Sequence, residues 1–239
     1  MKQTKFCVVA AVILLGACSG CISMERTYDR HTGKSWCALG TSITWYDAHA
    51  DASGGRFKRG YQSRVKDRLD FTGYENCGCN GGVVKTQWGN VKFGDIYTIE
   101  HGVNDWGHSV KPGTIDDYVN ATSNGTFAAN YRVLIDNVRT VNPKATIILC
   151  TPRKAYGFGT YLPKSSAEPK NGIYLREYAE VVRAIAAREG FTVADFNAEC
   201  GENDELPSLS IDVALHPNDP GYQRMADCLV KAMADALGL

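Results

Sequence analysis

Short apolar runs alternate along this chain with segments in which apolar residues recur three or four positions apart. A short apolar run bounded by turn-forming residues is typical of a buried strand, and the wider spacing is typical of a helix that buries one face. The runs predict strands at residues 36–40, 71–76, 95–100, 145–150 and 191–196. The spacing predicts helices at residues 61–69, 131–138, 174–185 and 220–237.

The order of these elements predicts the fold class. Strands that alternate with helices form β-α-β crossovers, which produce a parallel sheet covered on both faces. We therefore expect an α/β fold, a single-domain three-layer α/β/α sandwich. Gly190 should end one helix, and Asp219 is the predicted N-cap of the last helix because Pro220 suits a first turn. Two irregular stretches, 110–124 and 153–170, should lie at the carboxyl ends of strands, where parallel sheets bind ligands.

Composition is consistent with one domain and narrows the partner classes. The chain has 239 residues, of which 44% are hydrophobic, enough for a full core in one domain. Its 26 lysines and arginines balance its 26 aspartates and glutamates, and no basic cluster stands out. A nucleic-acid partner is therefore not expected, since such proteins carry an excess of basic charge.

The first residues predict export. Lys2 and Lys5 precede an apolar run at residues 6–15, which small residues follow, as in a secretory signal. The run is too short to span a bilayer as a helix. The string Leu15-Gly16-Ala17-Cys18 resembles the lipobox of bacterial lipoproteins, so we expect lipid anchoring at the cell envelope through Cys18, with plain secretion as the alternative.

These features divide the chain into three parts: a signal and the start of a tether at residues 1–21, a tether at 22–34 and the folded domain at 35–239. Within the domain, an oxidising compartment would allow disulfides. Six cysteines permit fifteen pairings, of which Cys200 with Cys228 is favoured because both flank the last strand and helix. Cys77 and Cys79 lack the spacing of a zinc site, and no metal is expected. The six cysteines are at 37, 77, 79, 150, 200 and 228.

Three polar residues suggest acyl transfer. Ser42 follows the first predicted strand, Asn104 follows the third, and His216 precedes the last helix. Acyl transfer needs an attacking oxygen, a donor to the developing oxyanion and a proton acceptor, which these side chains can supply in that order. Alternative interpretations are an N-cap for Ser42 and a turn residue for Asn104.

The strings around these residues resemble the SGNH hydrolases, also called the GDSL esterase and lipase family. They run in the family's order, and together they span nearly the whole predicted domain. Any one string is a weak signal, whereas four in order are a strong one. The strings are Gly40-Thr41-Ser42, residues 76–81, Gly102-Val103-Asn104-Asp105 and residues 212–218.

The resemblance implies a flavodoxin-like sheet of five parallel strands and a serine esterase that needs no cofactor. It implies that Ser42 is the nucleophile and His216 the general base, with an oxyanion hole made by the amides of Ser42 and Gly81 and the side chain of Asn104. The strand order it implies places a strand between Cys37 and Cys150, so these two should not form a disulfide.

Two departures from the family pattern affect the chemistry. Thr41 stands where the family has aspartate, which we expect to alter the loop more than the reaction. Asp212 lies four residues before His216, whereas the family spacing is three. Asp212 can orient the imidazole if the segment forms a helical turn, which we favour, because positions four apart then share a face. If the segment is extended, a Ser-His dyad remains.

Other serine hydrolase classes fit less well. The α/β-hydrolase elbow requires glycine two residues after the serine, where this chain has Thr44. The chymotrypsin class needs histidine first and an all-β fold.

The expected function is hydrolysis of an O-acyl group, most simply acetyl, on a carbohydrate. Trp45, Tyr46 and Trp106 follow the candidate residues and are predicted to line the cleft, with core packing as the alternative. A lysophospholipase or thioesterase of the same family, and a non-catalytic carbohydrate-binding protein on the same fold, are the competing hypotheses. The oligomeric state is not predicted.

Overall fold

The computed structural model describes residues 33–55, 57–121 and 125–239. The predicted export signal and Cys18 lie outside the described residues. Within the described part, no helix combines the length and apolar character that crossing a membrane requires.

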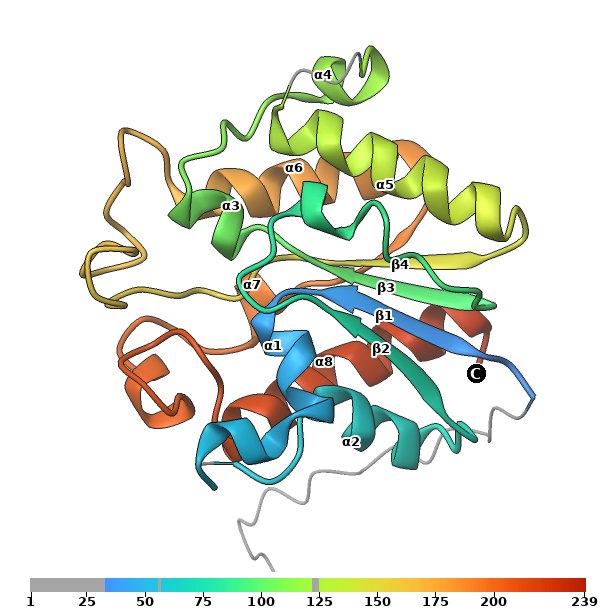
Figure 1. Ribbon diagram of the computed structural model, residues 1–239, viewed down its shortest axis with the longest axis horizontal. Helices are drawn as coiled ribbons and strands as arrows, with labels where there is room; N and C mark the ends of the chain where they lie inside the picture. Colours follow the sequence, from blue (N-terminus) through green and yellow to red (C-terminus); the bar gives the residue numbers. More distant parts are fainter. Residues whose placement is uncertain (1–32, 56, 122–124) are drawn as a thin grey trace, which may run out of the picture.

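Five parallel strands form one sheet in the order β2-β1-β3-β4-β5 (Figure 1). Every neighbouring pair is parallel, as the alternation of strands and helices predicts. The structure thus confirms the α/β fold with a five-stranded sheet. The strands are β1 (Trp36–Gly40), β2 (Tyr74–Gly78), β3 (Ile96–Glu100), β4 (Thr146–Cys150) and β5 (Thr192–Ala194).

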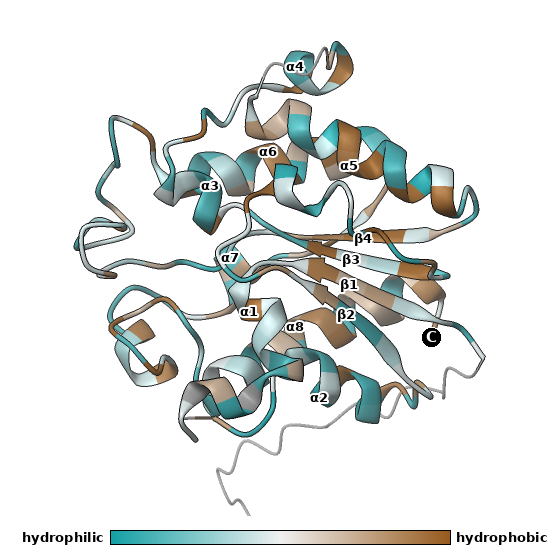
Figure 2. Cartoon of the chain, in the orientation of Figure 1, coloured by the Kyte–Doolittle hydropathy of each residue, from teal (hydrophilic) through white to brown (hydrophobic). Residues whose placement is uncertain are grey.

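Helices cover both faces of the sheet (Figures 1 and 2). On one face lie α3 (Val103–Gly107), α4 (Ile115–Val119), α5 (Phe127–Val141) and α6 (Leu175–Glu189). On the other lie α1 (Ser42–Trp45), α2 (Tyr61–Arg68) and α8 (Asp219–Leu237), while α7 (Phe196–Glu199) follows β5. Four short 3-10 turns are interspersed, at Tyr46–Ala48, Ala50–Ser53, Val84–Gln87 and Leu206–Leu209.

The central strands are apolar without alternation because each of their faces packs against helices. In β1, Cys37 and Leu39 enter the core beneath α5 and α6, whereas Trp36 and Ala38 enter the core beneath α2 and α8. Successive side chains of a strand point to opposite faces, so one five-residue run supplies both cores. All five residues of β1 are buried.

The element ends differ in places from the sequence prediction. Gly190 ends α6 with φ 71°, as expected for a glycine C-cap. The N-cap of α8 is Asn218, not Asp219: its side chain accepts a hydrogen bond from the Gly221 amide at 3.0 Å. Asp219 instead accepts hydrogen bonds from the Lys58 amide. The prediction was wrong because a cap one residue earlier reaches the helix amides while Pro220 still occupies the first turn.

The cysteines of the domain are all free thiols in the structure. Strand β3 lies between β1 and β4, as the implied strand order predicts, and so separates Cys37 from Cys150. The favoured bond between Cys200 and Cys228 is not formed, although both thiols are buried. Cys37 and Cys77 lie on neighbouring strands with their sulfur atoms 3.5 Å apart.

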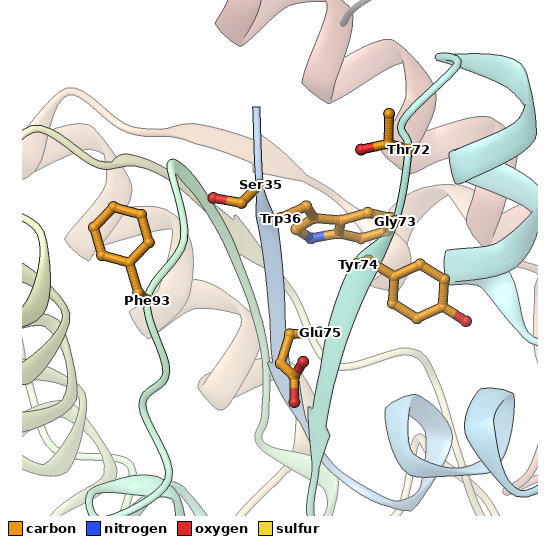
Figure 3. A pocket seen from close by; sticks show the side chains of 7 residues that line it. All are labelled: Ser35, Trp36, Thr72, Gly73, Tyr74, Glu75 and Phe93. Atoms are coloured by element: carbon orange, nitrogen blue, oxygen red, sulfur yellow. The ribbon is translucent and has the colours of Figure 1, made fainter. Parts of the chain in front are cut away.

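A surface pocket of about 280 Å3 lies at the amino ends of β1 and β2 (Figure 3). Because both strands run away from it, this pocket lies at the opposite end of β1 from Ser42. Its lining residues are Ser35, Trp36, Thr72, Gly73, Tyr74, Glu75 and Phe93.

Candidate active site

The candidate residues meet at the carboxyl edge of the sheet. Ser42 begins α1 two residues after β1 ends, and Asn104 lies in the first turn of α3, just after β3. Parallel neighbouring strands bring these ends together, which is why residues 62 positions apart share one site. The irregular segments 151–174 and 200–218 lie at the same edge (Figure 1).

Ser42 is held by the first turn of α1. Thr41, not Ser42, is the N-cap of this helix, and its Oγ1 accepts a hydrogen bond from the Ile43 amide at 3.3 Å. The Ser42 hydroxyl is therefore not used for capping, and its Oγ lies 3.0 Å from Nε2 of His216. The amide of Ser42 is the first of the helix and so has no acceptor within it.

Thr41 replaces the family's aspartate and is bound to a carboxyl group on the next strand. Glu100 Oε2 accepts from the Thr41 hydroxyl at 2.7 Å, from the Thr41 amide at 3.2 Å and from the Thr44 hydroxyl at 3.3 Å. Complete burial raises the pKa of Glu100 to about 7, even though these hydrogen bonds oppose the shift. A carboxyl group thus remains beneath the serine turn, supplied by β3.

Asp212 reaches His216 despite the longer spacing. Its Oδ2 lies 2.6 Å from Nδ1 of His216, and its Oδ1 accepts from the amides of Leu215 at 2.8 Å and His216 at 3.0 Å. A carboxylate beside Nδ1 favours the tautomer with the proton on that nitrogen, which leaves Nε2 free to accept the serine proton.

The segment from Asp212 to His216 is not the helical turn that we favoured. It is a series of bends, closed by a hydrogen bond from the Ile211 amide to the His216 carbonyl at 2.8 Å and by an antiparallel bridge between Ser210 and Pro217. The compact loop nevertheless brings the two side chains together, so the extended alternative, with its Ser-His dyad, does not describe this structure.

Arg153 anchors this loop from the end of β4. The side chain is 1% exposed, and its guanidinium group lies 3.3 to 3.5 Å from the Ser210 hydroxyl and the carbonyl groups of Leu209 and Leu215. Burial lowers the pKa of Arg153 to about 10, so the group still carries its charge at neutral pH.

The ionisation of Asp212 follows from its contacts. Burial by itself would raise the pKa of this carboxyl group, but the hydrogen bond to His216 and those from the Leu215 and His216 amides outweigh it, so the pKa lies below its ordinary value. Asp212 is therefore a carboxylate across the neutral range and can stabilise a positive charge on the imidazole.

Asn104 has both ends of its side-chain amide held. Nδ2 donates to the Gly82 carbonyl at 3.0 Å, and the Tyr161 hydroxyl lies 3.2 Å from both Oδ1 and the main-chain carbonyl oxygen of Asn104, either of which can accept its proton. The bond to Tyr161 fixes which way the amide points, and one proton of Nδ2 remains beyond the bond to Gly82.

Gly81 lies in the tight turn that follows β2. Its φ of 71° belongs to the left-handed region, which glycine adopts without strain, and the turn is closed by a hydrogen bond from the Gly82 amide to the Cys79 carbonyl at 2.9 Å. Because Gly82 also binds Asn104, the turn with Gly81 and the Asn104 side chain belong to one cluster.

The three predicted cleft aromatics have different surroundings. Tyr46 contacts His216, with ring centroids 5.2 Å apart. Trp45 stacks on His49 at 3.9 Å, at the end of α1. Trp106 is fully buried and donates from its indole nitrogen to the Ile173 carbonyl at 2.8 Å, which agrees with the alternative interpretation, core packing.

Besides Glu100 and Arg153, sequence reasoning missed two aromatic residues of the site, Phe158 and Tyr161. Phe158 lies against His216 with ring centroids 5.7 Å apart, and Tyr161 binds Asn104. Both belong to the irregular segment after β4, which has no periodicity to indicate which side chains face the site. The one available signal was the position of this segment after a strand.

His101, the other histidine near the motifs, is fully buried, and burial lowers its pKa to about 3. It is therefore uncharged at neutral pH. Among the described residues, no three His, Cys, Asp or Glu side chains are grouped as metal ligands would be.

A sequence profile of a known family and several solved structures match this chain. The sequence profile of the GDSL-like Lipase/Acylhydrolase family matches residues 38–224. A possible lipase from Chitinophaga pinensis is similar in structure, with a TM-score of 0.77 and 27% sequence identity over 87% of this chain and 100% of that chain. A search of curated protein sequences finds no match.

Solved structures with lower identity share the fold. A carbohydrate acetylesterase family member from Sinorhizobium meliloti has a TM-score of 0.58 at 18% identity, over 87% of this chain and 100% of that chain. A putative lipolytic protein of the G-D-S-L family from Desulfitobacterium hafniense has a TM-score of 0.60 at 14% identity, over 84% and 99%. The family profile spans well over half of the chain and includes Ser42, Asn104, Asp212 and His216, so this protein belongs to the GDSL-like lipase/acylhydrolase family and is a hydrolase that acts on esters.

Proposed function

We propose that this protein hydrolyses carboxylic esters through an acyl-enzyme formed on Ser42, with His216 as general base and Asp212 as the group that orients it. The observation that carries this assignment is the chain of contacts from Ser42 Oγ to His216 Nε2 at 3.0 Å and from His216 Nδ1 to Asp212 Oδ2 at 2.6 Å. Nucleophile, base and orienting acid are thus within direct reach of one another.

In the first half of the reaction, Ser42 Oγ attacks the ester carbonyl carbon while His216 Nε2 takes the hydroxyl proton. The negative charge that develops on the carbonyl oxygen is stabilised by the Ser42 and Gly81 amides and by Asn104 Nδ2, each contributing about 2.7 to 4 kcal/mol. The protonated His216 then gives its proton to the departing alcohol oxygen, and the acyl group remains on Ser42.

In the second half, water attacks the acyl carbon and gives a proton to His216. Collapse of the second tetrahedral intermediate returns that proton to Ser42 Oγ and releases the carboxylic acid. Asp212 stays ionised throughout, consistent with a pKa held below its ordinary value.

The substrate that we propose is an O-acetylated carbohydrate. Tyr46 and Phe158 place aromatic rings beside His216, and such rings can pack on the faces of sugar rings. A carbohydrate acetylesterase family member has the same fold. A lysophospholipase or thioesterase would use the same triad, so the acyl and alcohol groups must be found by experiment.

Hydrolysis of p-nitrophenyl acetate by the wild-type protein and by Ser42→Ala tests the assignment. We expect turnover that disappears in the variant, whereas equal rates would favour the non-catalytic binding protein. A screen over acetylated xylan, acetylated pectin, lysophospholipid and acyl-CoA, at equal protein concentration, then identifies the substrate class. Release of acetate from the polysaccharides alone supports the carbohydrate assignment, and turnover of only the lipid or thioester contradicts it.

We also propose that the domain is lipid-anchored through Cys18. The support is the order of charged, apolar and small residues before that cysteine. Labelling with radioactive palmitate in a bacterial host should modify the full-length chain and not Cys18→Ser. Equal labelling of both would contradict the anchor.

A further inference from the structure

The loop that carries the acid and the base also carries an exposed apolar residue. Val213, directly after Asp212, is 54% exposed, although the antiparallel bridge between Ser210 and Pro217 closes the loop that carries it. Four large apolar side chains are exposed in the described part of the chain: Phe93, Val141, Phe158 and Val213.

Two of these four lie together at the candidate active site. A Cβ atom placed on Gly157 would lie 2.6 Å from a methyl carbon of Val213, so the loop before α6 and the Asp212 loop are in contact at this point. The next residue, Phe158, is 42% exposed. Its ring packs against the His216 ring in a T-shaped arrangement, with an interplanar angle of 88°. Phe158, beside the imidazole, and Val213, beside Gly157, are thus two exposed apolar side chains on adjoining loops, and together we call them the 158/213 surface.

The position of this surface determines which part of an ester it can contact. In the proposed reaction the departing alcohol oxygen takes its proton from His216 Nε2, so the alcohol must lie next to the imidazole. The acyl carbonyl must instead lie at Ser42, whose oxygen attacks it, and beside the proposed oxyanion donors of Gly81 and Asn104. A side chain that borders His216 and is exposed to solvent is therefore positioned to meet the alcohol and not the acyl group.

We propose that the 158/213 surface binds the alcohol part of the substrate and favours alcohols that present the flat face of a ring, as a pyranoside does. An aromatic ring and a methyl-bearing side chain, neither charged, can cover the C–H face of a sugar ring while its hydroxyl groups stay in water. This inference rests on the proposed function and adds to it the residues that select the leaving group.

Acetate esters that share the acyl group and differ in the alcohol test the inference. We would measure kcat/KM for ethyl acetate, cyclohexyl acetate and a mono-O-acetylated methyl xyloside with the wild type, Phe158→Ala, Val213→Ser and Phe93→Ala. Phe93 is a matched control, because it is also an exposed phenylalanine, 63% exposed, but lies in the pocket at the other end of β1 (Figure 3).

We expect Phe158→Ala to lower kcat/KM for the xyloside about three- to tenfold, with a smaller loss in Val213→Ser. For both variants the loss with ethyl acetate should be clearly smaller than the loss with the xyloside, because ethanol has no ring to lie on the surface, and Phe93→Ala should leave all three esters unchanged. Both substituted side chains are largely exposed, so the variants should fold, which melting temperatures would check.

Several results would overturn the inference. An equal loss for all three alcohols would mean that Phe158 acts on His216 and not on the leaving group. No loss for any ester would mean that the surface does not contact substrate, and a loss confined to cyclohexyl acetate would show that it selects apolar alcohols and not sugars. Failure of the proposed function is distinguishable, since the wild type would then show no turnover that depends on Ser42.

Discussion

The Asp212 carboxylate binds its own loop as well as His216: one oxygen lies 2.6 Å from the imidazole Nδ1, while the other accepts the amides of Leu215 and His216. The same side chain thus shapes the loop and orients the base. Because Asp212 also holds the loop backbone, its carboxylate reaches the imidazole although it lies four residues before His216, and not three as in the family pattern.

Asp212→Asn should lower kcat by up to about 10,000-fold, because the amide no longer stabilises the imidazolium and favours the wrong tautomer. Asparagine retains an oxygen that can accept the two loop amides, so the loop should keep its form. Steady-state kinetics with p-nitrophenyl acetate would check the loss. A change in kcat of less than tenfold would mean that a Ser-His dyad carries the reaction.

Asn104→Ala should lower kcat about 100- to 1,000-fold with little change in KM, because an oxyanion donor acts mainly in the transition state. We also expect the free energy of unfolding to fall by about 1 kcal/mol, since the hydrogen bond to the Gly82 carbonyl is lost as well. Kinetics and thermal unfolding on the same preparation separate these effects. Reduced stability with unchanged kcat would make Asn104 a turn residue only.

Tyr161→Phe should lower kcat about three- to tenfold by releasing the Asn104 side chain from the hydrogen bond that orients it. Tyr156→Phe is a matched control in the same segment, because the Tyr156 hydroxyl binds the Asn203 carbonyl instead. The effect of Tyr161→Phe should vanish in the Asn104→Ala background, as expected for residues that act as a unit. The same loss in both backgrounds would exclude positioning through the Asn104 side chain, since the main-chain carbonyl at position 104, which the Tyr161 hydroxyl also contacts at 3.2 Å, remains in the variant.

Glu100 should make stability depend on pH. Its pKa is about 7 in the folded protein and about 4.5 in the unfolded chain, so between these values only the folded state keeps the proton. The free energy of unfolding should therefore fall as pH rises through this window, by about 3 kcal/mol at most from this group.

Melting temperatures between pH 5 and 8 would test this dependence. Glu100→Gln cannot ionise and should show a shallower fall. Two other buried groups also titrate: burial raises the pKa of Asp105 to about 7, which adds to the fall, and lowers the pKa of His101 to about 3, which opposes it up to the ordinary histidine pKa of 6.5. Glu168→Gln, at an exposed position, should behave as the wild type. Equal slopes in wild type and Glu100→Gln would show that Glu100 does not titrate in this range.

The positions of Ser42 and Asn104 were predictable because each directly follows a buried strand, and the carboxyl ends of neighbouring parallel strands meet. The local sequence pattern is therefore sufficient to predict where Ser42 and Asn104 lie. The sheet is predictable for the same reason, since its apolar runs can be recognised without knowledge of their partners.

The geometry of the Asp212 loop was not predictable in the same way. Its form depends on Arg153, which is about 60 residues away in sequence, and on the bridge between Ser210 and Pro217. Phe158 and Tyr161 were missed for a related reason: long-range contacts, not periodicity, determine which side chains of an irregular segment face the site. The N-cap at Asn218 shows that even local competition between neighbouring polar residues can shift an element by one position.

The proposed reaction requires Ser42 to be a nucleophile activated by His216. Mass spectrometry of the protein after treatment with a fluorophosphonate tests it most directly, since the reagent forms a covalent bond with an activated serine. We predict one adduct, mapped to Ser42, with loss of esterase activity in proportion to labelling. Ser42→Ala and His216→Ala should remain unlabelled. Labelling at another serine, or full activity after complete labelling of Ser42, would contradict the role of Ser42 as nucleophile.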